Sequence, residues 1–283
     1  MGSKRRRAAL LAPIYIFTVI FVFLPVIYLI FLSFTTRAKT WGIDLSFTLK
    51  NYADILEGAY ISSFAESLKM AFVTTLFTSF IGYPYAYFMA RLSGRWKSVM
   101  MSLLMIPFWV SELIRLRGWT VLFAANGPLD RLLMWMGITD EPLKLLYSRP
   151  IVAFGMIYAL LPFMILCVYS SVEKTDWRLV EASRDLGAGR MAAFWDVVFV
   201  QSFPGFLSGI ILTFVPSMGL FYISDILGGN KIVLVGSLIE QEATKGRNIP
   251  LAAALSVVLV VFTSVFILLY GVITKRSEPE GVV

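Results

Sequence analysis

The sequence predicts an all-α integral membrane protein with six transmembrane helices. Of its 283 residues, 58% are hydrophobic and only 15% are charged, and the mean hydropathy is +0.77. Ordinary soluble domains are about 45–50% apolar and about 25% charged. Several apolar runs also exceed the roughly 20 residues that a helix needs to cross a bilayer. The lipid bilayer is therefore the expected environment of most of the chain.

Six segments are long and apolar enough to be spans. They are expected at about 8–34, 67–91, 98–123, 151–172, 194–224 and 248–274. The third is the least regular, because Glu112, Arg115 and Arg117 interrupt its outer part. The fifth is expected to be kinked or broken, because it contains Pro204, Pro216, Gly205, Gly209 and Gly219. No long segment is repeated and no Pro/Ser-rich linker occurs, so we expect one transmembrane domain over residues 1–283.

Charge distribution predicts the orientation. The basic run Lys4–Arg7 before the first span is typical of a retained cytoplasmic anchor, since the apolar run after it is too long for a signal peptide. The proposed inside pieces (1–7, 91–97, 173–196, 275–283) hold 13 Lys/Arg and 7 Asp/Glu, whereas the outside pieces (35–69, 112–150, 225–247) hold 12 and 11. Both termini and Glu181 are thus expected in the cytoplasm, and Asn51 and Asp130 outside. Val233–Glu242 is expected to form a short helix at the outer surface.

The residue inventory argues against chemistry on this chain. It contains no His, which excludes a Ser–His dyad and an H-E-x-x-H zinc site, and the lone Cys167 has no disulfide partner. A G-x-x-x-x-G-K-[ST] loop for ATP is also missing. The pI of about 9.5 comes from basic residues in short loops between spans, which favours membrane orientation over nucleic-acid binding. We expect no catalytic residue, no metal and no cofactor on this chain.

A short charged island lies between spans four and five. Leu179, Ala182 and Leu186 fall on one face of a helix about two turns long, with charged residues on the other faces. Thr175 or Asp176 is expected to cap its start. Gly187 and Gly189 are expected to end it with φ > 0, and Arg190 to begin the next helix. A helix this short needs a partner surface.

The island resembles the EAA loop of the permease subunits of ABC importers. That family pattern is Glu-Ala-Ala, three residues, Gly, nine residues, then Ile-x-Leu-Pro. Here Ser183 replaces the second Ala, Val197 and Phe199 are apolar substitutes, and Val200 stands in place of the proline. The resemblance implies that loop 173–192 docks on a separate ATPase. Its coupling residues would be Glu181, Ala182, Ser183, Arg184, Asp185 and Gly187. The plainer interpretation is that Glu181 is solvated or paired with Arg184.

A second stretch, residues 218–229, resembles the fifth-helix segment of spermidine/putrescine permeases. The two resemblances together imply a type I ABC importer permease-like fold that carries polyamines across the bacterial inner membrane by alternating access. The implied partners are a second, different permease subunit, two ATPase subunits that bind ATP and Mg²⁺, and a periplasmic substrate-binding protein. Two alternatives stay open: the same fold with another solute such as an anion, or a channel or scaffold that is not coupled to ATP.

Two helix ends carry a carboxylate one turn beyond aromatic rings. Such pairs suit a cationic amine, which gains from the carboxylate and from the ring faces. The candidate path and gate residues are Phe108, Trp109 and Glu112 on span three and Phe221, Tyr222 and Asp225 on span five. Alternatively, the rings belong to the aromatic belt of the membrane interface, the carboxylates are solvated, and Arg115 pairs with Glu112.

Overall fold

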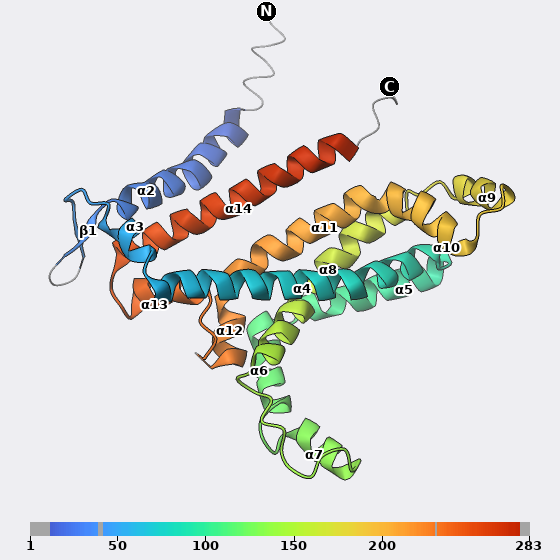
Figure 1. Cartoon of the computed structure of the whole chain (residues 1–283), viewed down its shortest axis with the longest axis horizontal. Helices are drawn as coiled ribbons and strands as arrows, with labels where there is room; N and C mark the ends of the chain where they lie inside the picture. Colours follow the sequence, from blue (N-terminus) through green and yellow to red (C-terminus); the bar gives the residue numbers. More distant parts are fainter. Residues whose placement is uncertain (1–11, 39–41, 230, 278–283) are drawn as a thin grey trace, which may run out of the picture. The chain divides into compact units, whose positions relative to one another are not determined.

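The computed structural model describes residues 12–38, 42–229 and 231–277 (Figure 1). The basic run Lys4–Arg7 and both chain ends lie outside the described residues. The chain groups into two compact units, one of residues 1–62 and 238–264 and the other of residues 63–237 and 265–283. The organisation as one transmembrane domain stays a prediction.

The first unit begins with a helix of 22 residues, Ala12–Ser33, that is apolar enough to span a membrane. The elements of its N-terminal part are η1 (Val19–Phe23), α2 (Leu24–Ser33), the antiparallel pair β1 (Thr36–Arg37) and β2 (Ile43–Asp44), and α3 (Lys50–Ile55). The side chain of Asn51 closes this loop region, donating to the carbonyl oxygens of Ser33 at 2.9 Å and Thr35 at 2.8 Å. Asn51 is consequently only 7% exposed.

The core of the second unit is made of long apolar helices. These are α4 (Gly58–Arg91), α8 (Arg149–Val172) and α11 (Val200–Gly219). Helices α8 and α11 lie side by side (Figure 1), and small residues allow the close approach: a Cβ atom on Gly205 would lie 2.6 Å from the carbonyl oxygen of Cys167. The hydroxyls of Tyr83 on α4 and Ser202 on α11 form a buried hydrogen bond of 2.7 Å. Since a buried hydroxyl without a partner is costly, this bond also fixes the register between α4 and α11.

The third span is not continuous, contrary to the prediction of 98–123. It consists of α5 (Gly94–Met105), the 3₁₀ turn η2 (Ile106–Trp109) and α6 (Glu112–Leu122), with a bend of 90° between the second and third pieces (Figure 1). The backbone is extended at Val110 and at Ser111, with ψ of 133° and 132°. Pro107, which has no amide hydrogen, precedes the bend. Glu112, Arg115 and Arg117, the charged residues that interrupt the outer part of this span, all follow it. The break thus keeps those charges off an apolar span.

The fifth span is broken, as predicted, but not at a proline. Its pieces are α10 (Arg190–Ala193), the π-helical η3 (Phe194–Phe199), α11, and α12 (Phe221–Gly228). Pro204 and Pro216 both lie inside α11, whereas the break falls at Leu220, where ψ is 61°. Gly229, with φ of 58°, then closes α12 in the left-handed conformation.

The remaining spans agree with the prediction in number and differ at their ends. Five helices are long and apolar enough to cross a membrane, or six when the bent pair is counted as one span. Helix α4 begins at Gly58, about nine residues earlier than expected. The other helices are α7 (Pro128–Trp135), α13 (Val235–Thr244) and α14 (Ile249–Ser277). A surface helix was predicted at Val233–Glu242, and α13 is found there, shifted by two residues. Its first turn is not at the surface, however, since Val235 and Ser237 are buried.

Candidate functional site

The charged island forms helix α9 (Trp177–Asp185). Asp176, rather than Thr175, caps it: a carboxylate oxygen accepts a hydrogen bond of 3.0 Å from the amide of Arg178. Gly187 follows the helix with φ of +93°, as expected, but Gly189 has φ of −67°, so the prediction of a second left-handed glycine was wrong. Arg190 begins the next helix, as predicted.

The island exposes its apolar face. Leu179 is 52% and Leu186 is 90% exposed. Both line a hollow of about 800 Å³ together with Val197, an apolar substitute in the EAA-like pattern, and Val200, which stands in place of its proline. Within the described chain the side chain of Glu181 makes no ion pair, so the pairing with Arg184 considered above is not found. The helix therefore offers an uncovered apolar strip flanked by unpaired charges.

The structure brings together two of the predicted gate residues from different spans. The hydroxyl of Tyr222 on α12 donates a hydrogen bond of 2.8 Å to a carboxylate oxygen of Glu112, the first residue of α6. Both residues stand just after the breaks in their spans. Asp225, one turn after Tyr222, accepts a hydrogen bond of 2.9 Å from the hydroxyl of Ser237 at the start of α13. Two carboxylates near the breaks are thus held by neutral hydroxyl groups.

The aromatic residues of span three do not lie one helical turn before Glu112, as was predicted. Phe108 and Trp109 lie in η2, before the 90° bend, so the helical one-turn spacing to Glu112 does not hold. The Phe108 ring packs edge-on against Phe163 at 5.8 Å between ring centres, and Trp109 is 85% exposed. By contrast, Phe221 lies on the same helix as Asp225, and its ring packs edge-on against Tyr222 at 5.9 Å.

Arg115 does not pair with Glu112. Its guanidinium lies 5.3 Å from the centre of the Tyr158 ring on α8, and its Nε atom is buried without a hydrogen-bond partner in the described chain. The Arg115 guanidinium thus contacts the face of an aromatic ring and not a carboxylate. Among the described residues, Glu112 therefore has the Tyr222 hydroxyl as its hydrogen-bond partner and forms no ion pair.

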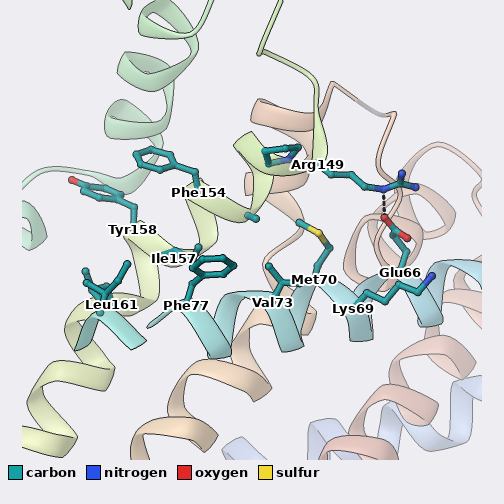
Figure 2. A pocket seen from close by; sticks show the side chains of 13 residues that line it. Glu66, Lys69, Met70, Val73, Phe77, Arg149, Phe154, Ile157, Tyr158 and Leu161 are labelled. Atoms are coloured by element: carbon teal, nitrogen blue, oxygen red, sulfur yellow. Dashed lines mark hydrogen bonds and ion pairs between the residues drawn. The ribbon is translucent and has the colours of Figure 1, made fainter. Parts of the chain in front are cut away.

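No pattern in the sequence indicated a groove between α4 and α8. This groove has a volume of about 830 Å³. Figure 2 shows Phe77, Phe154 and Tyr158 among the side chains that line it. Glu66 and Arg149 form an ion pair at one end of it. The two partners are 83 residues apart, and each looked like an ordinary charge near a helix end. Among the described residues, no group of three His, Cys, Asp or Glu side chains could hold a metal ion.

Relatives of the chain are transport proteins. Residues 82–280 match the family "Binding-protein-dependent transport system inner membrane component". The spermidine/putrescine transport system permease protein PotB of Salmonella typhimurium is 39% identical over 89% of this chain and 88% of its own length. PotB of Escherichia coli K12 is 37% identical over 93% and 97%, and PotB of Haemophilus influenzae 36% identical over 92% and 91%.

Solved structures show the same fold. A chain of a bacterial alginate ABC transporter, crystallised with its alginate-bound periplasmic protein, superposes with a TM-score of 0.81 over 100% of this chain and 99% of that one, at 15% identity. A chain of the MetNI methionine ABC transporter gives 0.59 over 77% and 95%, at 18% identity. The expected ABC importer permease fold is thus confirmed, and the chain is a multi-pass inner membrane transport subunit. With the family match spanning residues 82–280 and these relatives covering about nine tenths of it, the chain belongs to the family of inner membrane components of binding-protein-dependent transport systems.

Proposed function

We propose that this chain forms part of the translocation path of an importer for polyamines such as spermidine and putrescine. Support comes from the PotB relatives, which are 36% to 39% identical over about nine tenths of the chain. In this proposal, a periplasmic binding protein delivers the polyamine, and a separate ATPase drives alternating access. ATP and Mg²⁺ bind to the ATPase, and no cofactor binds to this chain.

The observation that carries the proposal is the pair of carboxylates near the broken ends of spans three and five. Glu112 and Asp225 are partly buried, and their printed partners are the hydroxyls of Tyr222 and Ser237. Among the described residues neither carboxylate forms an ion pair, so an ammonium group can pair with each of them at close range. The Tyr222 ring beside Glu112 adds a face suited to a cation. A neutral or anionic solute gains nothing from this arrangement.

Helix α9 is the proposed docking element for the ATPase. Its exposed Leu186 and Leu179 provide apolar contact, and Glu181, Ala182, Ser183, Arg184, Asp185 and Gly187 form the coupling segment. We further propose that the transporter contains a second, different permease subunit and two ATPase subunits. Both termini of this chain and α9 are then cytoplasmic. Movement of α9 by the ATPase would be transmitted through η3 and α11 to the break at Leu220.

Initial uptake of labelled spermidine and putrescine tests the proposal. Glu112→Gln and Asp225→Asn keep the size of each side chain and remove its charge, and each is expected to lower uptake roughly 10- to 150-fold, or about 1.5–3 kcal/mol. Glu141→Gln is the matched control, since Glu141 is exposed and makes no ion pair with the described residues. Expression and ATPase assembly are checked for every variant.

Two outcomes would contradict the proposal. The first is that Glu112→Gln and Asp225→Asn take up both amines as fast as the parent. The two carboxylates would then be ordinary solvated groups at helix ends, and an anionic solute would become the better candidate. Polyamine uptake that continues without the ATPase would favour a channel that is not coupled to ATP.

A further inference from the structure

Three arginines from three separate elements line one hollow of about 390 Å³. Arg91 is the last residue of α4, Arg184 lies on α9, and Arg190 is the first residue of α10. The other lining residues are Tyr87, Val180, Ala193, Phe194 and Val198. None of them is acidic, so the lining carries three positive charges and no negative one.

Arg91 is oriented by neutral groups. Arg91 donates a hydrogen bond of 3.0 Å from Nη1 to the Tyr87 hydroxyl, and its guanidinium lies 5.0 Å from the ring centre of Trp177. Within the described chain, no carboxylate oxygen lies within 4.0 Å of the Arg91, Arg184 or Arg190 side-chain nitrogens. Glu181 borders a neighbouring hollow and does not line this one. Three like charges around one hollow repel one another, so binding of an anion there is favourable.

An apolar strip leads along α4 to the same place. Phe80, Pro84 and Phe88 are spaced four residues apart and are all exposed, with Phe80 at 79%. Four-residue spacing places them on one helix face, and Arg91 follows Phe88 by three residues on that face. Tyr87 and Trp177, which contact Arg91, are the residue types that gather where a membrane meets water. The arginines that can bind a phosphate group therefore lie next to an apolar helix face that can bind an acyl chain.

We propose that this arginine hollow binds the phosphate of an anionic phospholipid, whose acyl chain lies along the Phe80–Phe88 face of α4. Guanidinium groups bind phosphate oxygens in pairs, and basic pockets between membrane helices on the cytoplasmic side suit anionic head groups. Placement in the inner leaflet rests on the orientation proposed above, and the lipid would join the end of α4 to α9. Free phosphate would contact only the arginines, and an acidic protein segment would not bind to the apolar strip.

Retention of lipid by the assembled transporter tests the inference. The complex is purified, titrated with cardiolipin or phosphatidylglycerol, and examined by native mass spectrometry. Phosphatidylcholine is the zwitterionic comparison, because its choline cation offsets the charge of its phosphate. Each of Arg91→Gln, Arg184→Gln and Arg190→Gln is expected to weaken retention about fivefold, or about 1 kcal/mol, and the triple variant to abolish it. Arg178→Gln is the control, because Arg178 is an exposed arginine of α9 that does not line the hollow. Phe88→Ser is expected to weaken lipid retention without changing the charge.

Three results would overturn the proposal. The first is equal retention by the triple variant and Arg178→Gln. The second is displacement by inorganic phosphate together with no effect of Phe88→Ser, which indicates a free-anion site. The third is protection of the arginines from chemical modification only when the ATPase is present, which indicates an acidic protein surface. Lipid retention is measured without transport, so failure of the polyamine proposal would not change the outcome.

Discussion

Glu112 and Tyr222 could each be selected from the sequence, but their contact could not. Both were chosen because helical spacing placed a carboxylate one turn from aromatic rings. That spacing is present on α12, which carries both Tyr222 and Asp225. It is absent at Glu112, because Phe108 and Trp109 lie on the other side of the 90° bend. The bond between them joins residues 110 positions apart. Local periodicity carries no information about such a distance, because the approach of α6 to α12 depends on two backbone breaks at once.

Removing the Tyr222 hydroxyl tests the strength of this contact. In Tyr222→Phe the ring is kept while the partly buried Glu112 carboxylate loses its donor, so we expect the complex to lose about 1.5–3 kcal/mol of stability. Thermal unfolding of the purified complex measures the loss. Tyr158→Phe is the control, since its hydroxyl makes no hydrogen bond with the described residues. Equal melting of the two variants would show that the Tyr222–Glu112 bond contributes no stability.

Glu173, just after α8, gives a pH-dependent prediction. Its pKa is lowered first by the hydrogen bond from the Tyr169 hydroxyl, at 2.7 Å, and then by the Lys97 ammonium, at 3.0 Å. A folded-state pKa below the unfolded value near 4.3 means that the stabilisation is present above that pH and is lost as the pH falls through the folded pKa. Because the Lys97 and Glu173 side chains are partly exposed, at 27% and 45%, we expect this stabilisation to be at most about 1 kcal/mol.

Melting of the parent and of Glu173→Gln from pH about 7 to about 3 checks this sign. The parent should be the more stable at neutral pH, and the difference should vanish in acid. Glu141→Gln should track the parent throughout. A difference that grows as the pH falls would contradict the lowered pKa.

At the scale of elements, the sequence predicted which segments are helices better than where they bend. The apolar runs for α8 and α11 were found almost in full, because length and hydropathy determine them. Span five was expected to be kinked or broken on account of its prolines and glycines, and its break occurs at Leu220, directly after Gly219. The 90° bend of span three was not expected. Neighbouring helices can accommodate a proline within a membrane span, so a proline alone does not specify a break.

Two glycines beside α9 form a matched pair for testing the coupling segment. Gly187 has φ of +93°, whereas Gly189 has φ of −67°, and a Cβ atom on either would meet nothing within 4 Å. Alanine at Gly187 is therefore strained by its backbone alone, at about 1–2 kcal/mol, while alanine at Gly189 is not. We expect Gly187→Ala to lower uptake and ATPase association, and Gly189→Ala to behave like the parent.

The same assays with Glu181→Lys reverse the charge on the exposed face of α9 and should abolish uptake without preventing membrane insertion. Normal uptake by both Gly187→Ala and Glu181→Lys would remove the basis for assigning a coupling role to this helix.

For the whole molecule, hydropathy and the distribution of charge predict how often and in which direction the chain crosses the membrane. Neither identifies which loop residues are accessible. The outer location of Asn51 and Asp130 stays a prediction, and both side chains are buried: Asn51 bonds to two carbonyl groups, and Asp130 accepts hydrogen bonds from the amides of Asn126 and Leu143. Cysteines placed there would fail to react on either side of the membrane.

Exposed neighbours give a sharper test of the orientation. Glu57 and Glu141 are exposed in the same two loops, and Glu181 is exposed on α9. In a Cys167→Ser background, we expect an impermeant thiol reagent to label Cys at positions 57 and 141 in intact spheroplasts, and to label position 181 only after the membrane is opened. The charge bias between loops sets this direction, since Lys and Arg are retained on the cytoplasmic side. Labelling of position 181 from outside would contradict this orientation. Helix α9 and the arginine hollow would then lie on the outer side of the membrane, where neither a cytoplasmic ATPase nor an inner-leaflet lipid could reach them.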